Sequence, residues 1–135
     1  MSVPDKISRN SCGLSGEYFV TAELYRRGFI VGLTMGNAKA IDILAAKNGV
    51  SYQIQVKTIR RKKSICWNIA YEKIMDNITY IMVNLNWDQS PDYYIMNANE
   101  VRKFHKQYNN RGIVDLNPVH RDGSFLNKWE KLESK

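Results

Sequence analysis

The hydrophobic and polar positions of this chain change their spacing along its length and so predict a series of helices and strands. Residues 11–27 have apolar side chains at helical spacing, so we expect a helix that begins between Ser11 and Ser15 and stops at Gly28. Residues 29–33 predict a strand, and Gly36-Asn37 predicts a turn after it. The first ten residues are polar, and we expect them to be flexible.

Residues 40–57 predict a β-hairpin around Asn48-Gly49, because both turn residues tolerate the positive φ of a type I′ turn. A two-residue loop puts Lys47 opposite Val50 and therefore Asp42 opposite Gln55, with Cβ atoms about 5 Å apart. Alternation divides the hairpin into two faces. The apolar face, which we expect to look into a core, comprises Ile41, Ile43, Ala45, Val50, Tyr52, Ile54 and Val56. The mixed face comprises Asp42, Leu44, Ala46, Ser51, Gln53, Gln55 and Lys57.

The second half of the chain predicts alternating strands and helices. Residues 69–75 suit a short helix or an irregular crossover, 79–85 a central apolar strand, and 93–96 another strand. Asn97 or Asn99 is expected to cap a helix that carries Val101, Phe104, His105 and Tyr108, and residues 109–124 are expected to form a loop. Phe125, Trp129 and Leu132 recur at i, i+4 and i+7, which predicts a C-terminal helix. The order favours an α/β fold with a central mixed β-sheet flanked by helices.

The composition narrows the class of protein. A length of 135 residues favours one domain over residues 1–135, and a net charge of +7 favours an anionic partner, most often nucleic acid. A ribosomal, membrane-surface or simply soluble basic protein is the alternative. The two cysteines form no CxxC pair, and no apolar run suits a signal peptide or a membrane span. We therefore expect a reduced, cytoplasmic protein without a membrane partner.

The mixed face of the hairpin suits a Mg²⁺ site beside a phosphate. Asp42 supplies a carboxylate, Gln55 an amide oxygen and Val56 a backbone carbonyl, all of them oxygen ligands. Lys57 projects to the same face, where its ammonium can polarise the attacking water or neutralise the phosphate. Glu17 is the candidate second carboxylate.

Glu17 is chosen for its place on the first helix. It lies with Val20 and Leu24 within an arc of roughly 60°, which puts it on the side facing the sheet. Glu23 lies about 120° round from it and is the poorer candidate. Gly13 and Gly16, just before Glu17, are interpreted as the geometry of a helix start.

Gly16-Glu17, Asp42 and Gln55-Val56-Lys57-Thr58 together resemble the PD-(D/E)xK nuclease superfamily, in its glutamine-bearing branch. That branch includes Mrr-like restriction enzymes and homing endonucleases, and the spacing is also similar to archaeal Holliday-junction resolvases. The resemblance covers residues 13–58. It implies a restriction-endonuclease-like fold and hydrolysis of DNA phosphodiester bonds with Mg²⁺, for which Mn²⁺ can substitute.

The resemblance also assigns roles to residues. It implies Glu17, Asp42, Gln55 and Lys57 as catalytic residues and the Val56 carbonyl as a further metal ligand. The chain departs from the commoner motif at Gln55, which replaces an acid and should lower metal affinity. Because one active site cuts one strand, a double-strand break implies a homodimer or a higher homo-oligomer.

Simpler interpretations stand beside these. Asp42 suits any exposed sheet face, Glu17 suits any helix start, and Lys57 could simply begin the basic run that follows it. That run is the candidate nucleic-acid-binding segment or a solvated loop; it comprises Arg60, Arg61, Lys62 and Lys63. His105 and His120 lack partners at ligand spacing and are expected to be structural. Four aromatic side chains are expected in the core: Trp67, Tyr93, Tyr94 and Trp129.

Two other functions remain open. One is a DNA-binding or assembly subunit that keeps the fold without turnover. The other is an enzyme that acts on RNA or on branched DNA, such as a junction resolvase.

Overall fold

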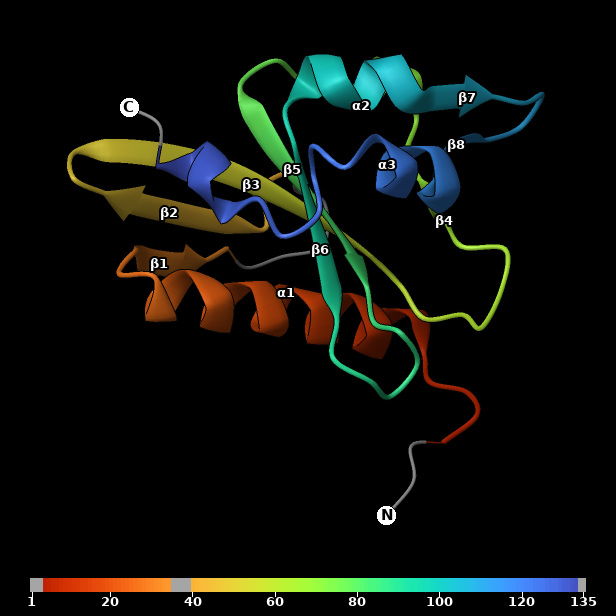
Figure 1. Ribbon diagram of the computed structural model, residues 1–135, viewed down its shortest axis with the longest axis horizontal. Coiled ribbons are helices and arrows are strands. Elements are labelled where there is room, and N and C mark those ends of the chain that lie inside the picture. Colours follow the sequence, from red (N-terminus) through yellow and green to blue (C-terminus); the bar gives the residue numbers. More distant parts are fainter. Residues whose placement is uncertain (1–3, 35–39, 134–135) are drawn as a thin grey trace.

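The computed structural model describes residues 4–34 and 40–133. The main sheet contains five strands in the order β1-β2-β3-β5-β6. They span β1 (Ile30–Leu33), β2 (Ile43–Lys47), β3 (Val50–Ile59), β5 (Ile78–Asn84) and β6 (Asp92–Met96). The pairing is antiparallel except between β3 and β5, which run parallel, so the sheet is mixed as predicted. Helix α1 (Arg9–Arg26) runs along one face of this sheet (Figure 1).

A second, three-stranded sheet lies beyond the opposite face of the main one. Its order is β4-β8-β7, from β4 (Cys66–Asn68), β7 (His105–Gln107) and β8 (Gly112–Asp115). Helices α2 (Ala98–Phe104) and α3 (Leu116–Asp122) lie next to it, and two short 3-10 helices occur at Tyr71–Lys73 and Trp129–Leu132. Figure 1 shows α2, α3 and this sheet gathered on the side away from α1.

The main sheet separates two hydrophobic clusters. The cluster on the α1 side joins Val20 and Leu24 of α1 to Ile43, Ile54 and other residues of the sheet. The cluster on the other side is built around Trp67, Tyr80, Met82 and Tyr94 with residues from α2 and α3. Strand β5 alternates between the two, which confirms the prediction that its apolar run is central.

The hairpin turn has the predicted geometry. Asn48 and Gly49 have φ of 53° and 79°, and Lys47 pairs with Val50. The register holds from that pair to Ile43 and Ile54, and the expected apolar residues Ile43, Ala45, Ile54 and Val56 are buried. The turn predicted at Gly36-Asn37 lies outside the described residues.

The observed start of α1 differs from the predicted one, because a side chain just outside the helix caps its first turn. Helix α1 begins at Arg9, before the predicted start, because the Ser8 hydroxyl accepts a hydrogen bond from Ser11 N–H. The prediction of a flexible start is therefore wrong for Arg9 and Asn10, which are helical; residues 1–3 lie outside the described part. Asn97 caps α2 in a reciprocal capping box with Glu100.

Three predictions for the second half of the chain are wrong. Helix α2 ends at Phe104, and His105 starts β7, because its backbone pairs with β8. Residues 109–124 form β8 and α3 rather than a loop. The C-terminal segment is a 3-10 turn, Trp129–Leu132, because Phe125 packs into the α2 and α3 cluster while Trp129 and Leu132 pack on the α1 side.

The aromatic predictions are confirmed. Trp67, Tyr93, Tyr94 and Trp129 are all buried, at 1 to 6 % exposure. None of the described helices combines the length and apolar character that a membrane crossing requires.

Candidate active site on the open end of strand β3

Strand β3 extends beyond the end of its partner β2. The ladder between them ends at Ile43 and Ile54, while β3 continues to Ile59. The predicted pairing of Asp42 with Gln55 is absent from this ladder. Instead, Asp42 N–H donates to the Ile54 carbonyl over 2.8 Å, so that Asp42 and Ile43 both lie opposite Ile54. Two residues facing one is the arrangement of a β-bulge, and it opens the end of β3.

The bulge changes which face the preceding residue occupies. Ile41, predicted to share the apolar face with Ile43, packs instead against the cluster on the other side of the sheet. One extra residue shifts the alternation by one, which moves a side chain from one face to the other.

Beyond the last pair of β2 and β3, the Asp42 side chain forms a hydrogen bond with the edge of β3. Its Oδ2 accepts a hydrogen bond of 2.8 Å from Val56 N–H. The Asp42 carbonyl accepts from Thr34 N–H at the β1 side over 3.0 Å. Asp42 is therefore fixed from both neighbouring strands, with its carboxylate next to the middle residue of the Gln55-Val56-Lys57 tripeptide.

Gln55 and Lys57 lie together on one face of β3. Their neighbours on β5 are Tyr80 and Met82, which belong to the cluster away from α1. Gln55 Nε2 donates to the Ala40 carbonyl over 2.8 Å, which ties this side chain to the chain just before Asp42. The amide nitrogen is thereby occupied, and the amide oxygen is the remaining group that can act as a ligand.

Lys57 is in a partly buried position beside Asp42. Burial lowers the pKa of Lys57, the Asp42 carboxylate acts to raise it, and the Lys73 ammonium lowers it further. Burial destabilises the charged ammonium, whereas a nearby carboxylate stabilises it. Perturbed lysines of this kind occur at functional sites, although structural ion pairs produce similar shifts.

Glu17 lies on α1, which packs against the other face of β3. Gly16 packs against Thr58 of β3 so closely that an added Cβ would lie 1.8 Å from Thr58 Oγ1. Thr58 and Val56 alternate with Gln55 and Lys57, so α1 covers the opposite face of β3. Gly16 is an interior helix residue, and its role is this close approach rather than the predicted helix start. Glu17 is half-buried next to it, and its part in the site stays a prediction.

The donors suit a hard cation. Asp42 offers a carboxylate, and Gln55 and Val56 offer an amide and a peptide oxygen at the same stretch of β3, which are the groups that Mg²⁺ accepts. Within residues 4–34 and 40–133, no group of three or more His, Cys, Asp or Glu side chains is placed to hold a metal. A cation here would therefore depend on the neutral oxygens as well as on Asp42.

A cleft of about 580 Å³ opens beside Val56 and Lys57. It lies between the start of α1, the open end of β3 and β4, and Lys and Arg predominate over acids in its lining. The charged residues along it are Asp5, Lys6, Arg9, Lys57, Arg60 and Arg61. An anionic chain entering this cleft would meet these cations beside Lys57.

The basic run separates into two environments. The Arg60 guanidinium lies 3.8 Å from the centre of the Trp87 ring and donates to the carbonyls of Pro4 and Asp5. Lys62 also lies over Trp87, at 4.6 Å. Arg60 therefore fastens the N-terminal segment and also lines the cleft, as does Arg61. Contact of any of these cations with nucleic acid stays a prediction.

No motif or pattern in the sequence singled out Trp87 as a functional residue. It reaches Arg60 because Asn86 and Trp87 both have positive φ, of 52° and 62°, in the turn after β5. The two histidines hold structural contacts, as expected: His105 Nε2 lies 2.8 Å from the Ile69 carbonyl, and His120 Nδ1 lies 2.8 Å from the Tyr94 hydroxyl.

Comparison with known proteins gives matches among solved structures. No family model matches the chain, and no curated protein matches it by sequence. A bacterial homing endonuclease, I-Ssp6803I, superposes with a TM-score of 0.67 at 11 % identity over 93 % of each chain. The Holliday junction resolvase Hjc of Archaeoglobus fulgidus superposes with a TM-score of 0.60 at 14 % identity, over 91 % of this chain and 96 % of Hjc. The chain therefore has the restriction-endonuclease-like nuclease fold.

Proposed function

We propose that this protein is a metal-dependent endonuclease that hydrolyses phosphodiester bonds of DNA. The observation that carries the proposal is the placement of the Asp42 carboxylate and the Lys57 amine on the open end of β3, next to a basic cleft. The same fold in a homing endonuclease and a junction resolvase supports it.

The oxygens of Asp42, Gln55 and Val56 would hold Mg²⁺, with Glu17 as the candidate carboxylate from α1. When bound, the ion supplies charge neutralisation at the scissile phosphate and a more acidic bound water. Mn²⁺ suits the same donors. Because Asp42 is fixed by Ile54 and Val56, its carboxylate does not have to be ordered when a substrate arrives.

Lys57 orients the water that attacks phosphorus. Hydrolysis adds a water oxygen to the phosphorus and breaks one P–O ester bond, and the leaving oxygen takes up a proton. The partly buried amine of Lys57 can donate to the phosphate oxygens as an ammonium. Burial, which lowers its pKa, also makes exchange of a proton with the water easier than for an exposed lysine.

A substrate panel tests the proposal. Supercoiled plasmid, linear duplex, four-way junction, single-stranded DNA and RNA are incubated with the protein in Mg²⁺, Mn²⁺ or EDTA, beside Lys57→Met. We expect metal-dependent cleavage of DNA that Lys57→Met abolishes. Equal cleavage by the wild type and Lys57→Met would contradict the assignment. A strong preference for the four-way junction would make the protein a resolvase.

A DNA-binding subunit without turnover is the second candidate. It is favoured by Gln55, because the side chain of Gln55 is a neutral amide and Asp42 supplies the carboxylate beside this stretch of β3. Salt-sensitive binding to DNA with no cleavage in either metal would support this function instead.

We also propose that the protein assembles into a homodimer or higher homo-oligomer. Apolar side chains on α1 and on the edge strand β1 are exposed, among them Tyr18 at 59 %, Tyr25 at 57 % and Ile30 at 78 %. Edge strands with such side chains favour pairing between copies. A single monomeric species in sedimentation at micromolar concentration, with and without DNA, would contradict this.

A further inference from the structure

A second, larger basic pocket lies next to the proposed active site. It has a volume of about 1050 Å³ and is formed by residues 61–66, the end of α2, β7, Arg111, the end of β8 and α3. Its cations are Arg61, Lys62, Lys63, Lys103, Lys106, Arg111 and Arg121. The expected catalytic and metal-binding residues do not line it. Three of its cations, Arg61, Lys62 and Lys63, belong to the basic run expected to bind nucleic acid, and the other four come from the second half of the chain.

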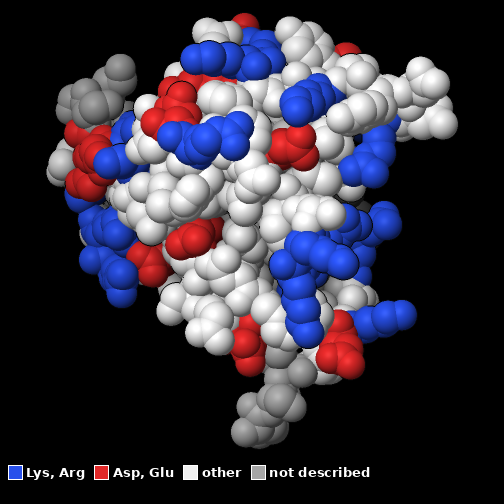
Figure 2. Space-filling model, turned by 45° about the vertical axis from the view of Figure 1, so that its right-hand side comes forward, with Lys and Arg blue, Asp and Glu red and all other residues white. Residues whose placement is uncertain are grey.

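This pocket accounts for most of the charge of the protein. Seven Lys and Arg and one acid, Asp115, are among the described residues that line it. The pocket therefore carries a net charge of +6 out of the chain's +7. The remaining sequence has thirteen Lys and Arg against twelve Asp and Glu. The basic character of the chain is therefore concentrated here, and Figure 2 shows Lys and Arg side chains gathered around an indentation on the right-hand side of that view.

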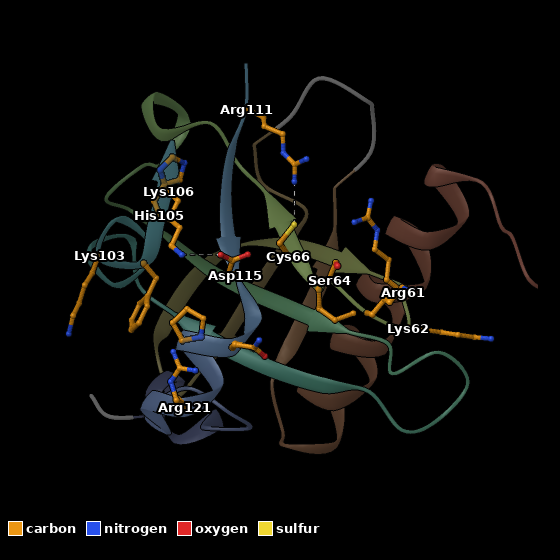
Figure 3. Close-up of a pocket in the computed structure, with 15 residues that line it drawn as sticks. Arg61, Lys62, Ser64, Cys66, Lys103, His105, Lys106, Arg111, Asp115 and Arg121 are labelled. Atoms are coloured by element: carbon orange, nitrogen blue, oxygen red, sulfur yellow. Dashed lines mark hydrogen bonds and ion pairs between the residues drawn. The ribbon is translucent and has the colours of Figure 1, made fainter. Parts of the chain in front are cut away.

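Few carboxylates balance these cations. Lys106 forms an ion pair of 3.3 Å with Asp115, and Arg111 donates to Cys66 Sγ over 3.4 Å. Figure 3 shows Arg111 and Arg121 pointing into the pocket and Lys62 and Lys103 extending outward at its rims. A guanidinium next to a thiol and without a carboxylate contact is well suited to bind an anion with its remaining N–H groups.

The pocket adjoins the cleft beside Lys57. Arg61 and Cys66 line both, so the two hollows meet at these residues. A chain with regularly spaced negative charges can therefore be bound in the cleft and in the pocket at the same time.

We infer that this pocket binds the sugar-phosphate backbone of the same DNA molecule, at phosphates beyond the one that is cleaved. This inference rests on the proposed function for the identity of the ligand. The pocket positions the DNA by its backbone, because each of its cations can neutralise a phosphate.

The test compares three double variants, each of which removes two positive charges. Arg111→Gln with Arg121→Gln removes two pocket cations, and Arg26→Gln with Lys128→Gln removes two cations outside the pocket and the cleft. A third variant, Lys103→Gln with Arg121→Gln, keeps the contact of Arg111 with Cys66. Affinity for a fluorescent duplex is measured without divalent metal at several salt concentrations, and turnover is measured with bis(p-nitrophenyl) phosphate, which is too small to span both sites.

We expect both pocket variants to weaken duplex binding at least tenfold at about 0.1 M salt and to reduce the slope of log K against log[salt] by about two. The control variant should change affinity less than twofold, and turnover of the small phosphodiester should be unchanged in all three. Equal loss in the control variant, or an unchanged slope in the pocket variants, would overturn the inference.

Competition by polyglutamate as effective as that by DNA would assign the pocket to an acidic protein instead. Because binding is measured without cleavage, a protein that binds in this way but never cuts would refute the proposed function and leave the pocket assignment standing.

Discussion

The Asp42 carboxylate lies 2.8 Å from the backbone nitrogen of Val56 and accepts its hydrogen bond where the ladder between β2 and β3 has ended. A residue proposed for chemistry thus also satisfies a backbone donor of the sheet. Its two tasks can be separated, because an amide oxygen can replace the hydrogen-bond acceptor but not the negative charge.

Asp42→Asn should keep the fold, and Asp42→Ala should weaken it. The asparagine oxygen can still accept from Val56 N–H, whereas alanine leaves this partly buried donor without its partner, at a cost of about 1 to 3 kcal/mol. Urea denaturation of both variants measures the difference. Equal stability of the two variants would show that the bond to Val56 contributes nothing.

Gly13→Ala and Gly16→Ala should have opposite effects although both lie within α1. A Cβ at Gly13 meets nothing within 4 Å, so alanine there should stabilise the helix by about 0.5 to 1 kcal/mol. A Cβ at Gly16 would overlap Thr58, so alanine there should destabilise by about 1 to 3 kcal/mol. Thermal denaturation checks the signs. The loss at Gly16 should shrink in a Thr58→Ala background, and a loss that stays the same would exclude the contact as its cause.

Lys73→Met should raise the pKa of Lys57. Burial and the Lys73 ammonium both lower this pKa, so removing Lys73 leaves burial opposed by Asp42. Because the folded pKa lies below the unfolded one, Lys57 makes stability rise with pH in the alkaline window between the two, and the variant narrows that window. A side-chain NMR titration of labelled lysine reports the shift, with Lys128→Met as the control. A lower or unchanged pKa in Lys73→Met would contradict this arrangement.

Gln55→Glu should increase affinity for Mn²⁺ by about tenfold, because a second carboxylate would join Asp42. The variant gives up the hydrogen bond from Gln55 Nε2 to the Ala40 carbonyl, so a small loss of stability should accompany it. Isothermal titration with Mn²⁺ measures the affinity. Gln53→Glu, two residues earlier on the same face of β3, is the matched control and should leave affinity unchanged. A similar gain in both variants would mean that the ion is attracted by charge alone.

The hairpin was predictable because its determinants are local. Asn48-Gly49 fixes the turn, and the turn fixes the register as far as Ile43 and Ile54. The register fails at Asp42, because the bulge is set by tertiary hydrogen bonds to Thr34 and Ile54 that alternation does not encode. The motif still led to Asp42, Gln55 and Lys57, since resemblance depends on residue order and not on which pairs face each other.

The second sheet could not be predicted from the sequence, because its strands are short. Strands β4, β7 and β8 are three to four residues long. Strand β4 pairs with a segment far away in the sequence, Trp67 with Val114, while β7 and β8 are consecutive strands in which Lys106 pairs with Ile113. Strands of this length carry too little periodicity to be distinguished from loops. The basic run supplied three cations of the basic pocket, Arg61, Lys62 and Lys63, but the other four come beside them only when this sheet forms.

Metal-dependent nicking of supercoiled plasmid by Asp42→Asn tests whether the Asp42 carboxylate takes part in cleavage. Asp88→Asn, in the loop after β5, is the matched control for loss of one carboxylate. We expect the wild type and Asp88→Asn to nick plasmid in Mg²⁺ or Mn²⁺ and not in EDTA. We expect Asp42→Asn, folded and still binding DNA, to be at least a hundredfold slower. Nicking by Asp42→Asn at the wild-type rate would exclude Asp42 from the chemistry.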